Sequence, residues 1–163
     1  MGWSNLRALA TASLLLLFTV VTGVAWAADD LIAGSDLDKI AEIARGYGSV
    51  KPAQTDDNGK AWLELRTEGQ KYYLEVYPKS GKKCEGNCNL AFTVCGTSDQ
   101  KPTFDEMNSW IADHWSVVDW NKDDGTCLSL YLLAYDGKFT QSQIEAAFDL
   151  WLLDYAAYRK SFQ

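Results

Sequence analysis

Apolar and polar side chains alternate in several short runs of this chain, which is the pattern of strands buried on one face only. We predict strands at residues 50–54, 61–66, 72–77, 90–95, 117–120 and 126–135. Asn58-Gly59 predicts a tight hairpin turn, because such a turn needs residues that adopt positive φ. Glu68-Gly69-Gln70 predicts a second turn. Strands joined by short turns pair antiparallel.

Three other segments place apolar residues at helical spacing, and they predict helices over residues 37–44, 104–115 and 141–155. Ser35 can cap the first helix, while Thr103 and Glu106 have the spacing of a capping box that opens the second. The predicted order of elements is αβββ(β)αββα. We therefore expect an α+β fold, with a single antiparallel β-sheet and the helices packed on one of its faces.

The other face of this predicted sheet would look outward. Alternation assigns to it a mixed set of side chains: Trp62, Glu64, Arg66, Tyr73, Glu75, Tyr77, Cys95, Ser129 and Tyr131. Exposed aromatic patches usually contact something, so Trp62, Tyr73, Tyr77 and Tyr131 are the candidate binding residues. The alternatives are that a terminal segment or a second copy of the chain covers them, or that they pack only as cross-strand pairs.

The first 27 residues have the layout of an export signal. Arg7 provides a charged start, residues 14–21 are apolar, and residues 25–27 form the small-x-small pattern that signal peptidase cleaves. We expect cleavage before Ala28, which leaves residues 28–163 as one domain in the periplasm or outside the cell. The alternative is a retained membrane anchor, since about 20 apolar residues suffice to cross a bilayer.

The charge balance restricts the class of partner. The full chain carries 15 basic and 22 acidic side chains, and removal of the signal segment takes away one arginine and no acid. The mature domain therefore has a net charge of −8. Phosphates require a basic footprint, so we expect no nucleic-acid partner.

All four cysteines lie in the part of the chain that we expect to be exported: Cys84, Cys88, Cys95 and Cys127. An even number of cysteines in an oxidising compartment is typical of disulfides, although spacing alone leaves three pairings open. Cys95 and Cys127 fall on the outward side of their strands, where neighbouring strands bring cysteines within bridging range. We favour Cys95–Cys127 and Cys84–Cys88. A zinc site lacks its second C-x2–4-C pair, and a redox pair is more often C-x-x-C.

Several short motifs lie between the cysteine loop and the last predicted helix: Asn89-Leu90-Ala91-Phe92, Met107-Asn108-Ser109-Trp110, the hairpin that follows, and Phe148-Asp149-Leu150-Trp151. As a set they resemble the YbjN domain, a bacterial family described as sensory transduction regulators, over most of residues 35–162. The resemblance implies a fold similar to type III secretion chaperones and a possible dimer, and it brings no catalytic motif. The export signal, Cys95 and Cys127 depart from the family pattern, which weakens the cytoplasmic regulatory role that the family name suggests.

The sequence offers little for catalysis. His114 is the only histidine, and it lies near a predicted helix end, where an imidazolium interacts favourably with the helix dipole; we assign it a structural role. Asp56-Asp57 and Asp123-Asp124 sit at hairpin tips, where turn chemistry accounts for them. There is no glycine-rich phosphate loop or metal-spaced histidine pair. We expect no enzyme activity, no cofactor and no metal.

One acidic segment partly resembles a calcium loop. Asp119, Asn121 and Asp123 have the spacing of its first three ligands. The glycine, however, is Gly125 instead of the sixth residue, and Leu130 replaces the bidentate glutamate. An EF-hand is therefore excluded, and weak calcium binding is only a minor alternative.

These observations predict an exported, non-enzymatic interaction module. We expect it to bind a protein partner or a second copy of itself through the outward sheet face or a groove beside the last helix. The alternative is a small-ligand module, for example for carbohydrate, that stacks its ligand on Trp62, Tyr73, Tyr77 and Tyr131.

Overall fold

The computed structural model describes residues 30–78, 84, 88–96, 101–134 and 136–162, so the predicted signal segment lies outside the described residues. In chain order the described elements are β1 (Ile32–Ala33), α1 (Leu37–Ala44), β2 (Ser49–Val50), β3 (Gln54–Thr55), β4 (Ala61–Thr67), β5 (Gln70–Pro78), β6 (Cys88–Gly96), α2 (Phe104–Asp113), β7 (Val117–Asn121), β8 (Gly125–Leu132), β9 (Lys138–Phe139) and α3 (Gln141–Phe162).

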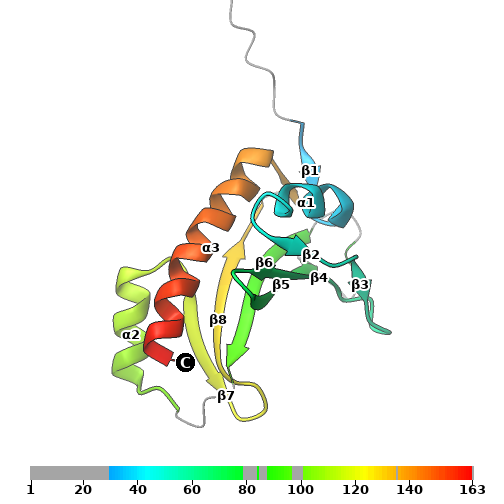
Figure 1. Ribbon diagram of the computed structural model, residues 1–163. Helices are drawn as coiled ribbons and strands as arrows, with labels where there is room; N and C mark the ends of the chain where they lie inside the picture. The colour runs from blue at the N-terminus through cyan, green and yellow to red at the C-terminus, as the bar shows by residue number, and fades with distance from the viewer. Residues whose placement is uncertain (1–29, 79–83, 85–87, 97–100, 135, 163) are drawn as a thin grey trace, which may run out of the picture.

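The main sheet has the strand order β2-β4-β5-β6-β8-β7, and β3 also pairs with β4 (Figure 1). All of these pairs are antiparallel. At the β4–β5 turn, Glu68 and Gly69 have φ of 51° and 80°, the positive pair of a two-residue hairpin. Before β4, the Asp56 carboxylate accepts hydrogen bonds from the backbone N–H groups of Asn58 and Lys60. The predicted α+β class with a mainly antiparallel sheet is confirmed.

One face of the main sheet, the inner face, is packed against α1 and α3. In Figure 1, α3 runs along the sheet and α1 lies near its N-terminal half. Phe92 of β6 meets Phe148 edge-on at a centroid distance of 4.8 Å and stacks on Trp151 at 5.6 Å. Tyr72 of β5 packs on the same tryptophan at 5.6 Å. Because all four rings are at most 1 % exposed, aromatic packing holds α3 on the sheet.

Helix α2 lies beside α3 (Figure 1) and opens with the predicted capping box. The Thr103 hydroxyl accepts a hydrogen bond from the Glu106 backbone N–H, and the Glu106 carboxylate accepts one from the Thr103 N–H. After α2, the buried Asp154 carboxylate of α3 accepts hydrogen bonds from the backbone N–H groups of Trp115 and Ser116, at 3.0 and 2.8 Å. It also accepts one from the Ser116 hydroxyl at 2.7 Å. These bonds fix the α2–β7 turn to α3.

The predicted order of strands needs two corrections. Segment 50–54 is not one strand: β2 and β3 are separate two-residue strands that pair with different parts of β4. Pro52 lies between them and has no backbone N–H to donate to a ladder. The prediction of a single sheet is also wrong, because β1 and β9 form a second, two-stranded sheet in which Ile32 pairs with Phe139. Two-residue strands are too short to produce a recognisable alternation.

Helix ends also differ slightly from the prediction. Asp36, and not Ser35, caps α1, because the Asp36 carboxylate accepts the hydrogen bond from the Lys39 backbone N–H. Helix α2 ends at Asp113, two residues before the predicted end at Trp115. The backbone N–H of Trp115 instead donates a hydrogen bond to Asp154 of α3. The end of α2 is thus set by a tertiary contact.

Candidate functional site

The face of the main sheet opposite α1 and α3 is hollowed into a concavity of about 580 Å³, which we call the outer basin. Strands β5, β6, β8 and β7 carry most of it. The residues that line it are Lys60, Lys71, Tyr73, Glu75, Tyr77, Thr93, Val94, Cys95, Asp119, Asn121, Asp124, Cys127, Ser129 and Tyr131. The described helices α1 and α3 pack against the other face, and within the outer basin Tyr131 is 54 % exposed.

Small side chains form the floor of the outer basin. The register aligns Thr93 of β6 with Tyr73 of β5 on one side and with Ser129 of β8 on the other. In a neighbouring row, Ala91 is aligned with Tyr131 and has no exposed surface. Thr93 and Ser129 thus lie beside the larger tyrosine side chains in the lining of the basin.

Tyr77, Glu75 and Lys60 form a linked group on one side of the basin. The Tyr77 hydroxyl donates a hydrogen bond to the Glu75 carboxylate, and Lys60 forms an ion pair with the same carboxylate at 2.9 Å. The Lys60 ammonium also lies 5.5 Å from the centroid of the Tyr77 ring, within cation–π range. Burial, followed by the hydrogen bond to Glu75, raises the pKa of Tyr77. Its hydroxyl therefore stays protonated, while the charge of Lys60 is already neutralised.

Lys71 is the second cation of the outer basin. Its ammonium lies 5.4 Å from the centroid of the Tyr73 ring, and a hydrogen bond with the Tyr73 side chain raises the pKa of Lys71. The salt bridges within the described part of the chain do not include it. Lys71 therefore presents a positive charge that forms no ion pair with a carboxylate of the described residues, although the more distant Glu64 carboxylate also raises its pKa.

Asp119 on β7 and Asp124 in the β7–β8 turn form the acidic side of the basin. The Asp124 carboxylate accepts a hydrogen bond from the Asn121 side-chain amide at 3.1 Å. Asp119 is exposed, but its partial desolvation raises the pKa of its carboxyl, and the nearby negative charge of Asp124 adds to the effect. Neither carboxylate takes part in a salt bridge of the described residues. This side of the basin thus carries negative charge that is not neutralised.

A disulfide crosses the floor of the basin between β6 and β8. It joins Cys95 and Cys127, which occupy directly paired positions with Cα atoms 4.0 Å apart. Cys95 is exposed, whereas Cys127 is 6 % exposed. The second disulfide joins Cys84 and Cys88. These are the pairs that the sequence favoured, and two disulfides are typical of proteins in an oxidising environment.

Three of the four residues that the sequence proposed for binding lie together in the outer basin: Tyr73, Tyr77 and Tyr131. The fourth, Trp62, lies on the next strand, β4, where it is aligned with Glu75. It is half-buried and does not belong to the lining of the basin.

Sequence reasoning missed the charged residues at the two sides of the basin. Lys71 lies two positions before Tyr73 on β5, so alternation puts both on one face. Asp119 follows the inward-facing Val118 on β7 and therefore points outward. Side-chain alternation could therefore have predicted that Lys71 and Asp119 lie on the outward face, as it did for the tyrosines. It did not show which of the charges would lack a partner.

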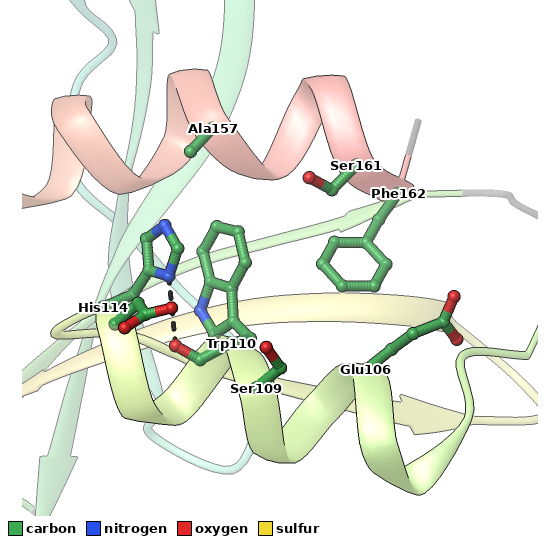
Figure 2. Close-up of a pocket in the computed structure, with 8 residues that line it drawn as sticks. Glu106, Ser109, Trp110, His114, Ala157, Ser161 and Phe162 are labelled. Carbon is green, nitrogen blue, oxygen red and sulfur yellow. Dashed lines mark hydrogen bonds between the residues drawn. The ribbon is translucent and has the colours of Figure 1, made fainter.

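A second, smaller hollow of about 290 Å³ lies between α2 and α3. Figure 2 shows the His114 ring beside the Trp110 ring of α2, with Ala157, Ser161 and Phe162 on α3. The His114 and Trp110 centroids are 3.6 Å apart, and His114 Nδ1 donates a hydrogen bond to the Trp110 carbonyl oxygen at 3.0 Å. These contacts engage one ring face and one ring nitrogen, which is how a structural histidine is held.

Local turn contacts occupy the acidic hairpin tips. The Asn121 side-chain oxygen accepts hydrogen bonds from the backbone N–H groups of Asp123 and Asp124, at 2.9 and 2.7 Å. Asp56 makes equivalent contacts before β4. Among the residues that the structure describes, no group of three or more histidine, cysteine, aspartate or glutamate side chains is arranged to hold a metal ion.

Neither a model of a known protein family nor a curated protein matches this chain. The resemblance to the YbjN domain therefore stays a prediction. Within the described ranges, no helix has both the length and the apolar character needed to span a membrane.

Proposed function

We propose that this chain is an exported, non-enzymatic binding module that holds a polypeptide partner in its outer basin. The observation that carries the proposal is an open, concave sheet face lined by Tyr73, Tyr77 and Tyr131. Concavities of several hundred Å³ with aromatic walls and a few convergent polar groups are where proteins bind ligands.

The construction of the basin also favours binding. Paired strands and the Cys95–Cys127 disulfide hold its side chains in place before a ligand arrives, which lowers the entropic cost of association. Tyrosine offers a large contact area with few rotatable bonds and is enriched at protein interfaces. Tyr131 is 54 % exposed, so a partner that covers it removes apolar surface from water.

Export is part of the proposal. Cleavage before Ala28 would release residues 28–163 into the periplasm or the medium, and the two disulfides are in keeping with that environment. A retained signal segment would instead tether the domain to the membrane. A YbjN-like, chaperone-like domain is compatible with a protein-interaction role, whereas the oxidising setting argues against a cytoplasmic regulator.

Peptide display against the mature, disulfide-bonded domain tests the proposal, because the selection itself supplies the ligands. We expect selected peptides to bind the natural domain and to lose at least about tenfold in affinity on Tyr73→Ala or Tyr131→Ala, because each removes a wall of the basin. Phe104→Ala is the matched control, since Phe104 is 75 % exposed on α2 and lies outside the basin. Selected peptides that bind all variants equally would sink the proposal, as would a failure to select any.

A carbohydrate is the second candidate, and one observation favours it: the hydroxyls of Thr93 and Ser129 lie on the floor beside tyrosine rings. Sugars bind where rings stack and hydroxyls donate and accept hydrogen bonds. Titration with a panel of soluble oligosaccharides, followed by the amide resonances of Thr93 and Ser129, separates the two candidates. Saturable shifts with a sugar, and none with selected peptides, would favour the sugar.

A second copy of the chain is the other partner to consider. Light scattering of the mature domain over a range of concentrations reports this directly. A dimer that Tyr131→Ala dissociates, and Phe104→Ala does not, would identify the basin as a self-association surface.

A further inference from the structure

Opposite charges face each other across the floor of the outer basin. The paired positions of β5 and β6 end at Tyr73 and Thr93; two residues beyond this pair on each strand, Lys71 falls opposite Cys95, and both line the basin. Cys95 is paired with Cys127, and Cys127 is paired with Asp119. One row across four strands therefore has a cation at one end, a disulfide in the middle and a carboxylate at the other end.

The two charged ends do not neutralise each other. Adjacent strands lie about 4.8 Å apart, so three spacings separate the Cα atoms of Lys71 and Asp119 by roughly 14 Å. Lys71 is held over the Tyr73 ring and forms no ion pair in the described part of the chain. Asp124 lies near Asp119 and reinforces the negative end.

The remaining charges of the basin do not remove this polarity. Lys60 and Glu75 form an ion pair with each other, so their net contribution is close to zero. Glu64, the carboxylate that acts on Lys71 from β4, is itself paired with Lys51 and Arg66. What remains is bipolar: one ammonium without an ion pair on the β5 side and two carboxylates on the β7 side. A neutral ligand that covered the whole floor would desolvate these charges without pairing them, which is unfavourable.

We propose that the outer basin recognises an extended peptide segment of its partner that carries a carboxylate and an ammonium group about four residues apart. The carboxylate contacts Lys71, the ammonium contacts Asp119 and Asp124, and the backbone between them crosses the Cys95–Cys127 disulfide. This inference rests on the proposed function and specifies the chemistry of the partner.

The dimensions and shape of the basin favour this occupant. An extended chain advances about 3.4 Å per residue, so residues four apart share one face and their Cα atoms are separated by roughly 14 Å, which matches the spacing of the Cα atoms of Lys71 and Asp119. A convex segment fits a hollow, whereas two copies of the same concave face would enclose a void.

Three short peptides, blocked at both ends, provide the test: acetyl-Asp-Ala-Ala-Ala-Lys-amide, acetyl-Lys-Ala-Ala-Ala-Lys-amide and acetyl-Asp-Ala-Ala-Ala-Asp-amide. Each is titrated into the mature, disulfide-bonded domain, and binding is followed through its amide resonances. We expect the mixed-charge peptide to bind about tenfold more tightly than either single-sign peptide, because only it pairs both ends of the basin.

Charge-removing variants show which end contacts which group. Lys71→Met should weaken the mixed-charge peptide about fivefold without weakening the all-lysine peptide, and Asp119→Asn with Asp124→Asn should weaken both. The matched controls are Lys39→Met and Glu42→Gln, exposed positions on α1 outside the basin, which should change nothing.

The outcomes separate this inference from the function on which it rests. Equal binding of all three peptides, reduced by Tyr131→Ala and insensitive to Lys71→Met, would leave the peptide-binding function standing and overturn the bipolar recognition. Absence of basin shifts with these peptides and with display-selected ones would overturn both. Preferential binding of neutral sugars, or self-association through the basin, would also contradict the inference.

Discussion

The inner and outer faces of the main sheet are built from alternate residues of the same strands, yet they are covered differently. On β6, Phe92 is buried against two rings of α3, while its neighbour Thr93 lies in the outer basin. On β5, Tyr72 has no exposed surface, whereas Tyr73 lines the basin. A step of one residue therefore separates aromatic side chains that hold the fold from those that are available to a ligand.

Stability and binding can consequently be altered separately in one sheet. Rings stacked between sheet and helix stabilise the inner face, and their loss leaves a cavity. The outer face combines tyrosines, hydroxyls and charged groups around a floor of small residues, and its side chains lie outside the aromatic packing that holds α3. Variants of the inner-face rings should thus strongly destabilise the domain, whereas variants of the outer-face tyrosines should mainly change what it binds.

The largest effect is expected for Phe92→Ala. Removal of this ring opens a cavity beside Phe148 and Trp151 and should lower the free energy of unfolding by about 3–5 kcal/mol. Tyr131→Ala on the adjacent strand is the outer-face counterpart and should cost less than about 1 kcal/mol. Urea unfolding of both variants checks this pair. Equal losses would show that the two faces do not differ in this way.

The two disulfides are also expected to differ in how much each one stabilises the fold. Their half-cystines are separated by 32 positions for Cys95–Cys127 and by 4 for Cys84–Cys88. Because the loop-closure entropy increases with loop length, replacing the first pair with alanines should cost about 3–4 kcal/mol and replacing the second about 2 kcal/mol. Denaturant midpoints of the two double variants provide the measurement. A larger loss for the short loop would contradict this assignment.

Replacing Asp154 tests whether α3 stabilises the turn between α2 and β7. Asp154→Ala leaves the backbone N–H groups of Trp115 and Ser116 without their buried acceptor and should cost about 1–3 kcal/mol. Asp149→Ala, exposed on the same helix, is the matched control and should change stability by less than about 0.5 kcal/mol. Thermal unfolding distinguishes them; the reverse order would show that the buried contact does not stabilise the turn.

The smallest expected effect is the pH dependence that Asp119, on the outer face, gives to the stability of the domain. Because partial desolvation and Asp124 raise the pKa of Asp119 in the folded state, folding favours its protonated form. Its contribution to stability is therefore greatest below the ordinary carboxyl pKa and is lost as pH rises through the raised folded-state value. Asp119→Asn should gain stability relative to the natural domain across this acidic window and keep the gain at neutral pH. Urea unfolding at a series of pH values measures the difference, and a difference that stays constant through the titration of carboxyl groups would contradict this.

The sequence was sufficient to predict the fold in those places where side-chain alternation and local capping determine the structure. The strands that carry Tyr72, Phe92 and Leu128, the Thr103 capping box and the Cys95–Cys127 pairing all follow from these rules. It was insufficient where structure depends on distant contacts. The two-residue sheet pairing of Ile32 with Phe139 has no periodicity of its own.

The candidate site was predicted only in part for a related reason. Alternation assigns Tyr73, Tyr77 and Tyr131 to one face, but it does not say which strands are neighbours. The row from Lys71 to Asp119 exists only because β6 and β8 are adjacent, although α2 and β7 separate them in the chain. Which charges remain unneutralised likewise depends on the three-dimensional arrangement.

If the open outer face is where the partner binds, a bound peptide must perturb the residues that line it. A map of backbone amide shifts in the disulfide-bonded domain of residues 28–163, recorded during titration with a display-selected peptide, measures this. We expect the largest shifts to cluster at Tyr73, Thr93 and Ser129 on the floor and wall of the outer basin. Shifts centred instead on Trp110 and His114, in the hollow between α2 and α3, would show that the partner binds elsewhere.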